Sequence, residues 1–214
     1  CGLLCGALVD FVDIDQKTLN MSVEALRKKL ILAKQKNKLP KIVIPVHLAG
    51  KSCDMEEIYK LSLEYGFKII EDASHAISAI YNNKKVGSCE FSDAAIFSFH
   101  PVKIITTGEG GMVLTNNSKL NEKLKLLRQN GITKNKNNYF NKSHGTWYYE
   151  QHLLGYNYRI TEIAAALGLS QLKKIEDFKR KRHNLASNYK DALQNSKILL
   201  PDISKDDSLH LYVI

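Results

Sequence analysis

Short apolar runs alternate with amphipathic stretches along most of this 214-residue chain, and that alternation restricts the fold more than any other feature. A continuous apolar run bounded by polar residues is typical of a buried strand, whereas apolar residues spaced three or four apart are typical of a helix. Strands that alternate with helices favour an α/β fold with a largely parallel sheet covered by helices. The expected strands are 9–12, 41–46, 67–70, 94–97, 112–115 and 209–214.

The expected helices are 22–32, 54–65, 119–128 and a longer pattern over 161–194. Ser22 is a candidate N-cap for the first helix, and Gly131 closes the third. The length of the last pattern suggests a helix that crosses between two domains. We therefore expect part of a large domain at 1–160, a connecting helix at 161–195 and the start of a smaller domain at 196–214. Because the chain begins without Met and ends inside an expected strand, it is interpreted as a fragment of a longer polypeptide.

The composition narrows the class of protein. A formal net charge of +9 either attracts an anionic partner or reflects a general excess of Lys, and the second reading is favoured. No basic run is interleaved with aromatic residues, so nucleic acid is not an expected partner. No apolar run approaches the ~18 residues that span a bilayer, and no signal peptide fits, so no membrane partner is expected. The four cysteines lack C-x-x-C spacing, which favours reduced thiols, no metal site and a cytoplasmic location.

Lys103 lies between the expected strand 94–97 and a loop rich in Thr and Gly that leads to the next strand. This context places an amine on a rigid, partly buried turn. Burial disfavours the ammonium form, and the neutral amine is a nucleophile toward aldehydes. A lone lysine here would more simply be a surface residue, so the interpretation depends on its neighbours.

Asp72 follows the expected strand 67–70, and ligand-contacting residues in open α/β sheets cluster at the carboxyl ends of strands. A carboxylate at that point can keep a pyridine nitrogen protonated, as pyridoxal 5′-phosphate (PLP) chemistry requires. His75 could hydrogen-bond the phenolic oxygen of the same cofactor. Taken separately, Asp72 could be a turn residue and His75 a core histidine; Lys103 favours the cofactor reading.

Further segments appear in a fixed order around these residues: 9–15, 45–51, 70–76, 86–88, 97–111, 155–159 and 164–168. In that order the chain resembles the DegT/DnrJ/EryC1/StrS family of PLP-dependent sugar aminotransferases. The resemblance covers nearly the whole chain. It implies the type I, aspartate aminotransferase-like fold.

The resemblance also implies a role for individual residues. Lys103 would bind PLP covalently and then move a proton between the cofactor and the substrate. Asp72 would pair with the pyridinium nitrogen, and His75 would lie beside the ring oxygen. Ser98 would hydrogen-bond the cofactor phosphate, and Asn157 would reach the phosphate in a neighbouring subunit, so the active unit would be a homodimer. Ser98 could otherwise be an ordinary strand-end serine, and Asn157 a turn residue.

The family resemblance implies glutamate as amino donor and a keto group on a nucleotide-linked sugar as acceptor. Three local segments, 49–52, 100–107 and 147–151, resemble the subgroup that acts in pseudaminic acid biosynthesis. That subgroup aminates C4 of a UDP-linked 6-deoxy-sugar. The aromatic cluster at Trp147 could stack on the sugar or nucleotide, or could simply pack within its loop.

Two alternatives remain open at the level of sequence. PLP-dependent sugar dehydratases share the fold but carry His in place of the lysine, which Lys103 disfavours. A non-catalytic regulator could keep the fold and the ligand site. A nicotinamide-binding protein is disfavoured because no expected strand is followed by G-x-G-x-x-G. The Gly-Thr or Ser-Thr-Ala turn of the family, which holds the PLP phosphate, and the small C-terminal domain are absent from these 214 residues.

Overall fold

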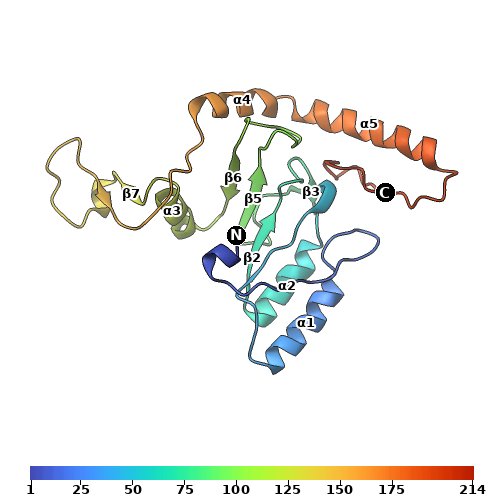
Figure 1. Ribbon diagram of the computed structural model, residues 1–214, viewed down its shortest axis with the longest axis horizontal. Coiled ribbons are helices and arrows are strands. Elements are labelled where there is room, and N and C mark those ends of the chain that lie inside the picture. The colour runs from blue at the N-terminus through green and yellow to red at the C-terminus, as the bar shows by residue number, and fades with distance from the viewer.

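The computed structural model describes residues 1–214 and is built around one four-stranded sheet in the order β1-β2-β5-β6 (Figure 1). The first three strands are parallel, and β6 is antiparallel to β5. This confirms the predicted α/β architecture with a mostly parallel sheet. The strands are β1 (Ile42–Val43), β2 (Lys68–Asp72), β5 (Ala94–Ser98) and β6 (Gly111–Leu114).

Two helices, α1 (Val23–Gln35) and α2 (Met55–Tyr65), pack together beside β1 and β2 (Figure 1). The Ser22 hydroxyl accepts the Ala25 N–H at 3.2 Å, as the sequence predicts for an N-cap. The apolar faces of both helices meet the sheet in the first core. Each large apolar side chain buried there contributes about 1.5–3 kcal/mol to stability. This core contains Leu26, Leu30, Val43, Cys53, Met55, Ile58, Leu61, Phe67 and Ile69.

A second core lies under β5 and the loops that follow β2 and β5. It contains Ala73, Ala76, Ala79, Val86, Phe97, Phe99, Ile104, Ile105 and Ile175. The three alanines come from the loop after β2, and Phe99, Ile104 and Ile105 come from the loop after β5, so both loops contribute to one core. Ile104 and Ile105 are both buried, and they fix the segment that immediately follows Lys103.

The long helical pattern forms two helices, α4 (Glu162–Leu172) and α5 (Ile175–Leu193), along one side of the sheet (Figure 1). A single continuous helix was therefore the wrong prediction. The chain breaks at Lys173 and Lys174, and this break turns Ile175 into the second core. The domain boundaries proposed from the sequence stay a prediction.

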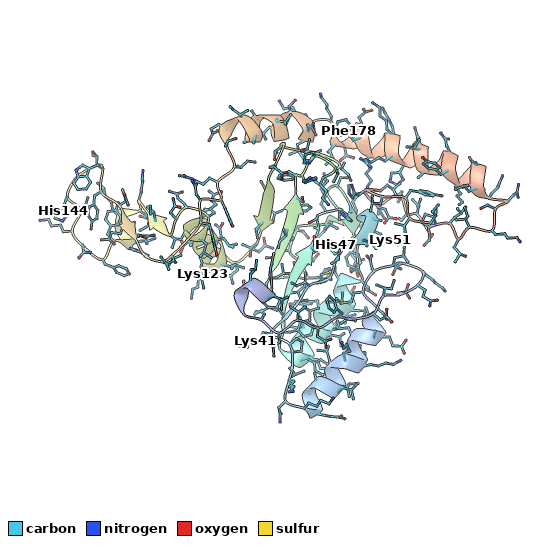
Figure 2. All side chains as sticks on the ribbon, in the orientation of Figure 1. Lys41, His47, Lys51, Lys123, His144 and Phe178 are labelled. Atoms are coloured by element: carbon cyan, nitrogen blue, oxygen red, sulfur yellow. The ribbon has the colours of Figure 1, made fainter.

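An arm projects from the sheet beyond β6 (Figure 1). It begins with α3 (Ser118–Leu127) and continues into a loop whose two ends pair as antiparallel strands, β7 and β8. His144 lies in the far part of this loop (Figure 2). The remaining short elements are β3 (Ile80–Tyr81), β4 (Lys84–Lys85), β7 (Ile132–Thr133), β8 (Glu150–Gln151) and the 3₁₀ turns Leu3–Cys5, Leu48–Gly50 and Lys136–Asn138.

Two predicted strands, 9–12 and 209–214, are not strands in the structure. Both runs are apolar, but a strand also needs a neighbouring strand to pair with. Phe11 is 81% exposed, and the 9–12 run joins no sheet. In the second run, the backbone N–H groups of His210 and Leu211 instead donate to Ala49 O, in the turn Leu48–Gly50.

The predicted strand 41–46 is largely irregular beyond Val43. Pro45 lacks an N–H and cannot donate to a ladder. A single bridge from Val46 to Asp72 continues the pairing. None of the helices combines the length and apolar character needed to cross a membrane.

Candidate active site

The candidate site lies at the carboxyl ends of the parallel strands β2 and β5. Asp72 is the last residue of β2, and Ser98 is the last residue of β5. His75 and Lys103 follow these strands, on the loops over the second core. All four side chains are half-buried. The parallel pairing explains this arrangement, because parallel strands bring their carboxyl ends to one edge of the sheet.

Asp72 is fixed by its backbone on one side of the strand. Its N–H donates to Pro45 O at 2.9 Å, and its carbonyl accepts the His47 N–H at 3.0 Å. Its Oδ1 accepts the Ser74 N–H at 3.1 Å. One carboxylate oxygen is thus held by the protein, so the side chain has a defined direction.

His75 has a defined tautomer in this structure. Its Nδ1 accepts the Ala49 N–H at 3.3 Å, which assigns the ring proton of the neutral form to Nε2. Burial lowers the pKa of His75, the Lys103 ammonium lowers it further, and the Asp72 carboxylate partly opposes both. His75 is therefore a neutral donor near neutral pH.

The turn Leu48–Gly50 supplies the N–H that holds His75. Ala49 has φ of 58°, an unusual left-handed conformation for a residue with a side chain. Gly50 has φ of 97°, and a Cβ there would lie 2.9 Å from both His75 O and Leu209 N. Only glycine therefore fits at position 50.

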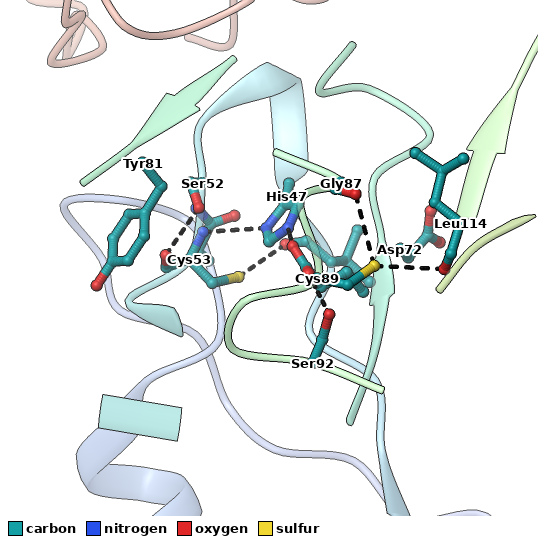
Figure 3. A network of polar contacts seen from close by, with 12 residues as sticks. His47, Ser52, Cys53, Asp72, Tyr81, Gly87, Cys89, Ser92 and Leu114 are labelled. Carbon is teal, nitrogen blue, oxygen red and sulfur yellow. Dashed lines mark hydrogen bonds and ion pairs between the residues drawn. The ribbon is translucent and has the colours of Figure 1, made fainter. Parts of the chain in front are cut away.

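A buried polar network supports this turn from below (Figure 3). His47 Nδ1 accepts the Cys53 N–H at 3.1 Å, so Nε2 carries the proton and donates to Glu71 Oε2 at 2.8 Å. Ser92 Oγ donates to the other oxygen of Glu71. Through the backbone bond from His47 to Asp72 described above, the network fixes the strand end that carries the site carboxylate.

The buried thiol in this network is not a nucleophile. Burial, together with the nearby carboxylates of Glu71 and Asp54, raises the pKa of Cys53 to about 12. Because only the thiolate is a nucleophile, Cys53 is chemically inert at neutral pH.

Lys103 lies in a tight turn that is anchored on both sides. Its N–H donates to His100 O at 2.9 Å, and the Thr107 N–H donates to Phe99 O at 3.0 Å. The Lys103 Nζ forms no hydrogen bond or ion pair with another protein group. Its charge nevertheless lowers the pKa of His75, so the amine lies within electrostatic reach of the imidazole.

The loop after Lys103 packs directly against α4. The Thr106 N–H donates to Gln171 Oε1 at 2.9 Å. Gly168 lies so close to the loop that a Cβ there would be 2.7 Å from Thr107 Cγ2. The glycine is thus needed for the helix to make this contact.

Asn157 does not join the other four predicted site residues within this chain. It is exposed, and its Oδ1 accepts two hydrogen bonds from Arg159, at 3.1 Å and 2.8 Å. The segment that carries it is paired with Gln129, at the base of the arm. Asn157 therefore presents a polar group on the outside of the chain.

The aromatic cluster of the arm is only partly packed. Tyr148 lies against Tyr139 with ring centroids 5.1 Å apart, whereas Trp147 is 71% exposed and Tyr149 is 52% exposed. The simple packing alternative thus describes Tyr148 but not Trp147.

The sequence profile of the DegT/DnrJ/EryC1/StrS aminotransferase family matches residues 2–214. The chain belongs to this family. A relative from Campylobacter jejuni, UDP-4-amino-4,6-dideoxy-N-acetyl-beta-L-altrosamine transaminase, is 40% identical over 216 residues, covering 99% of this chain and 53% of the relative. The solved structure of Helicobacter pylori PseC, an aminotransferase involved in the biosynthesis of pseudoaminic acid, is 37% identical with a TM-score of 0.85. That match covers 98% of this chain and 53% of PseC.

The PLP form of Streptococcus pneumoniae Spr1654 is also similar, at 25% identity and a TM-score of 0.79, covering 98% of this chain and 55% of Spr1654. The chain thus spans about half the length of the proteins it matches. The family is PLP-dependent, and the donor set present here fits that cofactor. It offers an amine for the aldehyde, a carboxylate for the ring nitrogen, an imidazole N–H for the phenolic oxygen and a hydroxyl for the phosphate.

The sequence interpretation missed His210, whose ring lies against His75 with centroids 4.4 Å apart. Residues 209–214 carry an apolar pattern typical of a strand, and no local signal in it indicates a contact with a loop so far away in the chain. The contact between His210 and His75 is therefore visible only in the three-dimensional structure.

Proposed function

We propose that the protein is a PLP-dependent aminotransferase that moves an amino group from glutamate to the 4-keto position of a UDP-linked 6-deoxy-sugar. The observation that carries this proposal is the placement of Asp72 and His75 at the end of β2 and of Lys103 after β5, at the carboxyl ends of two parallel strands. We further propose that it acts in nucleotide-sugar biosynthesis of the pseudaminic acid type, in the cytoplasm. The similarity to the Campylobacter jejuni relative, which is named as a transaminase of a UDP-linked 4,6-dideoxy-sugar, supports this substrate class.

Each residue of the site has one task in this proposal. Lys103 would hold the cofactor through its amine and would move a proton to and from the substrate carbon. Asp72 would keep a proton on the ring nitrogen, and His75 would donate its Nε2–H to the phenolic oxygen. Ser98 binds the phosphate. PLP, when bound, supplies the electron sink for the exchange.

The active unit in this proposal is a homodimer. Asn157 is exposed on the outer side of the chain, and Arg159 orients its amide through two hydrogen bonds. An oriented polar group that serves no site of its own chain is suited to a site in a second copy. A change at Asn157 should weaken PLP binding only in the dimer. Sedimentation at several protein concentrations gives the oligomeric state, and PLP binding is compared at the same concentrations.

The first test is the visible spectrum of the protein mixed with PLP, beside the variants Lys103→Ala and Lys123→Ala. Lys123 is an exposed lysine on α3 and is the matched control (Figure 2). We expect a band that borohydride abolishes in the wild type and in the control, and no such band with Lys103→Ala. Transamination should also be abolished in that variant. Retained turnover in Lys103→Ala would contradict the proposed mechanism.

A second test separates aminotransfer from the alternatives. Incubation of the PLP-loaded protein with glutamate alone should release 2-oxoglutarate in one equivalent, because the amino group stays on the cofactor. A non-catalytic regulator releases none. A dehydratase releases water from the sugar without placing nitrogen on it, so nitrogen-labelled glutamate that leaves the product unlabelled contradicts the proposal. Comparison of UDP-linked with GDP-linked 4-keto-sugars then tests the nucleotide.

A further inference from the structure

We propose that His210 is a positioning residue that clamps the ring of His75 and so keeps its Nε2–H pointed at the ligand site. The expected effect of this clamp on PLP binding rests on the proposed function. The clamp itself is a feature of the protein alone and can be tested without any cofactor.

The two rings are in direct contact. Their centroids lie 4.4 Å apart with 40° between the ring planes, and His210 is only 8% exposed. The χ2 torsion of a histidine has a broad energy minimum. A half-buried ring that is held by only one hydrogen bond can therefore still rotate about χ2. A second ring packed against its face removes this freedom.

His210 is itself held by the same turn that holds His75. Its N–H donates to Ala49 O at 2.8 Å, while Ala49 N–H donates to His75 Nδ1 at 3.3 Å. Arg182 Nη1 donates to the carbonyls of Leu209 and His210, at 3.1 Å and 3.2 Å. Ala49 therefore bonds to both histidines, to the ring of His75 through its N–H and to the backbone of His210 through its carbonyl.

The side chain of His210 acts through its ring face. Its Nδ1 is buried and has no hydrogen-bond partner. An unpaired buried nitrogen adds nothing to stability, so a phenyl ring of similar size should serve the same contact. This distinguishes a ring clamp from a polar role of His210.

The charged groups around the pair keep both rings neutral. Burial, together with His75, Lys103 and Arg182, lowers the pKa of His210 to about 4. For His75, Lys103 acts in the same direction as burial, and Asp72 opposes it. Two neutral rings can stack without repulsion, so we expect the contact to persist through the neutral pH range.

The test is a two-bond proton–nitrogen NMR correlation of the histidine rings, which reports the tautomer of each ring. It is recorded on the full chain before and after addition of PLP. The variants are His210→Ala, which removes the ring, and His210→Phe, which keeps it. Leu211→Ala is the matched control, because Leu211 is 47% exposed and lies in the same segment.

We expect the Nε2–H pattern of His75 in the wild type, His210→Phe and Leu211→Ala, and an averaged pattern in His210→Ala. The dissociation constant of PLP should rise about tenfold in His210→Ala, comparable with the loss of an outer partner of a metal ligand, and by less than about twofold in His210→Phe. Thermal melting of each variant shows whether the chain is folded.

An unchanged His75 pattern in His210→Ala overturns the clamp, and so does a His210→Phe variant that behaves like His210→Ala. If the wild type binds no PLP at all, the proposed cofactor site fails, but the NMR comparison still decides the clamp. The two failures are thus distinguishable.

Discussion

Two histidine–glutamate pairs in this chain have the same geometry but different consequences. His47 Nε2 lies 2.8 Å from Glu71, and His152 Nε2 lies 2.8 Å from Glu150. Both carboxylates are buried, at 6% and 8% side-chain exposure. The first pair joins the loop after β1 to β2, under the candidate site. The second lies within the arm and joins two residues of the same short segment.

The difference lies in what each carboxylate connects. Glu71 is bonded by His47 and by Ser92, which come from separate parts of the main fold. Glu150 accepts the backbone N–H groups of Phe140 and Asn141, at 2.7 Å and 2.9 Å, all within the arm. The same chemistry therefore fixes the core in one region and folds a local loop in the other.

The largest effect is expected from Glu71→Ala. The change leaves His47 and Ser92 without their acceptor in a buried site, and we expect the free energy of unfolding to fall by about 3 kcal/mol. Urea denaturation measures it. Glu64→Ala, which removes an exposed carboxylate 3.7 Å from Arg27, is the control and should change the free energy of unfolding by less than about 0.5 kcal/mol. Equal losses in the two variants would contradict a stabilising role for the buried pair.

A smaller loss is expected from Ser92→Ala. The His47 bond remains, but one oxygen of Glu71 loses its donor, so the free energy of unfolding should fall by about 1 to 2 kcal/mol. Urea denaturation of the single and double variants with Glu71→Ala gives the coupling. If the two losses simply add, Ser92 does not act through Glu71.

Glu150→Gln should affect only the arm. The amide keeps an acceptor oxygen but cannot accept all the donors that converge on Glu150, so backbone amides of Phe140 and Asn141 should exchange with deuterium faster, by about tenfold. The amides of β2 and β5 should exchange at the wild-type rate. Faster exchange across the sheet would show that the arm and the main fold are one cooperative unit.

The smallest effect is expected from protonation of Glu150, which alters the stability of the arm only at acidic pH. Burial would raise the pKa of Glu150, but the hydrogen bonds from His152, Phe140, Asn141 and Tyr148 outweigh it and lower the pKa to about 2. A lowered carboxyl pKa stabilises the arm fully above the ordinary value of 4.5, and this contribution is lost as the pH falls toward 2.

Fluorescence can follow this acid transition, because Trp147 is the only tryptophan and lies in the arm. The fluorescence should change between about pH 4.5 and 2 while the helical circular dichroism from the rest of the chain stays constant. Glu150→Gln should lack the transition. A simultaneous change of both signals would remove the distinction between the two regions.

Local patterns predicted the parts of the fold that local chemistry decides. The helix after Ser22 follows from its cap and its apolar spacing, and the strand before Asp72 follows from a short apolar run. The placement of Asp72 and Lys103 at one sheet edge followed from strand ends alone. The roles assigned to the site residues stay predictions.

The features that the sequence did not reveal depend on distant contacts. The runs 9–12 and 209–214 are as apolar as true strands, but strand formation is decided by pairing partners. Lys173 and Lys174 are good helix formers, so the break there has no local signal; it is the burial of Ile175 that requires it. The contact of His210 with His75 has the same character.

The contact between α4 and the loop that follows Lys103 couples the positions of the helix and the loop. Gly168 leaves no gap against Thr107, and Gln171 holds the Thr106 backbone, so the helix and the loop cannot slide independently. A displacement of α4 is therefore transmitted to the backbone of the loop that follows Lys103. The carboxylate of Glu150 in the arm, by contrast, bonds only to residues of the arm, so it makes no such link to the sheet.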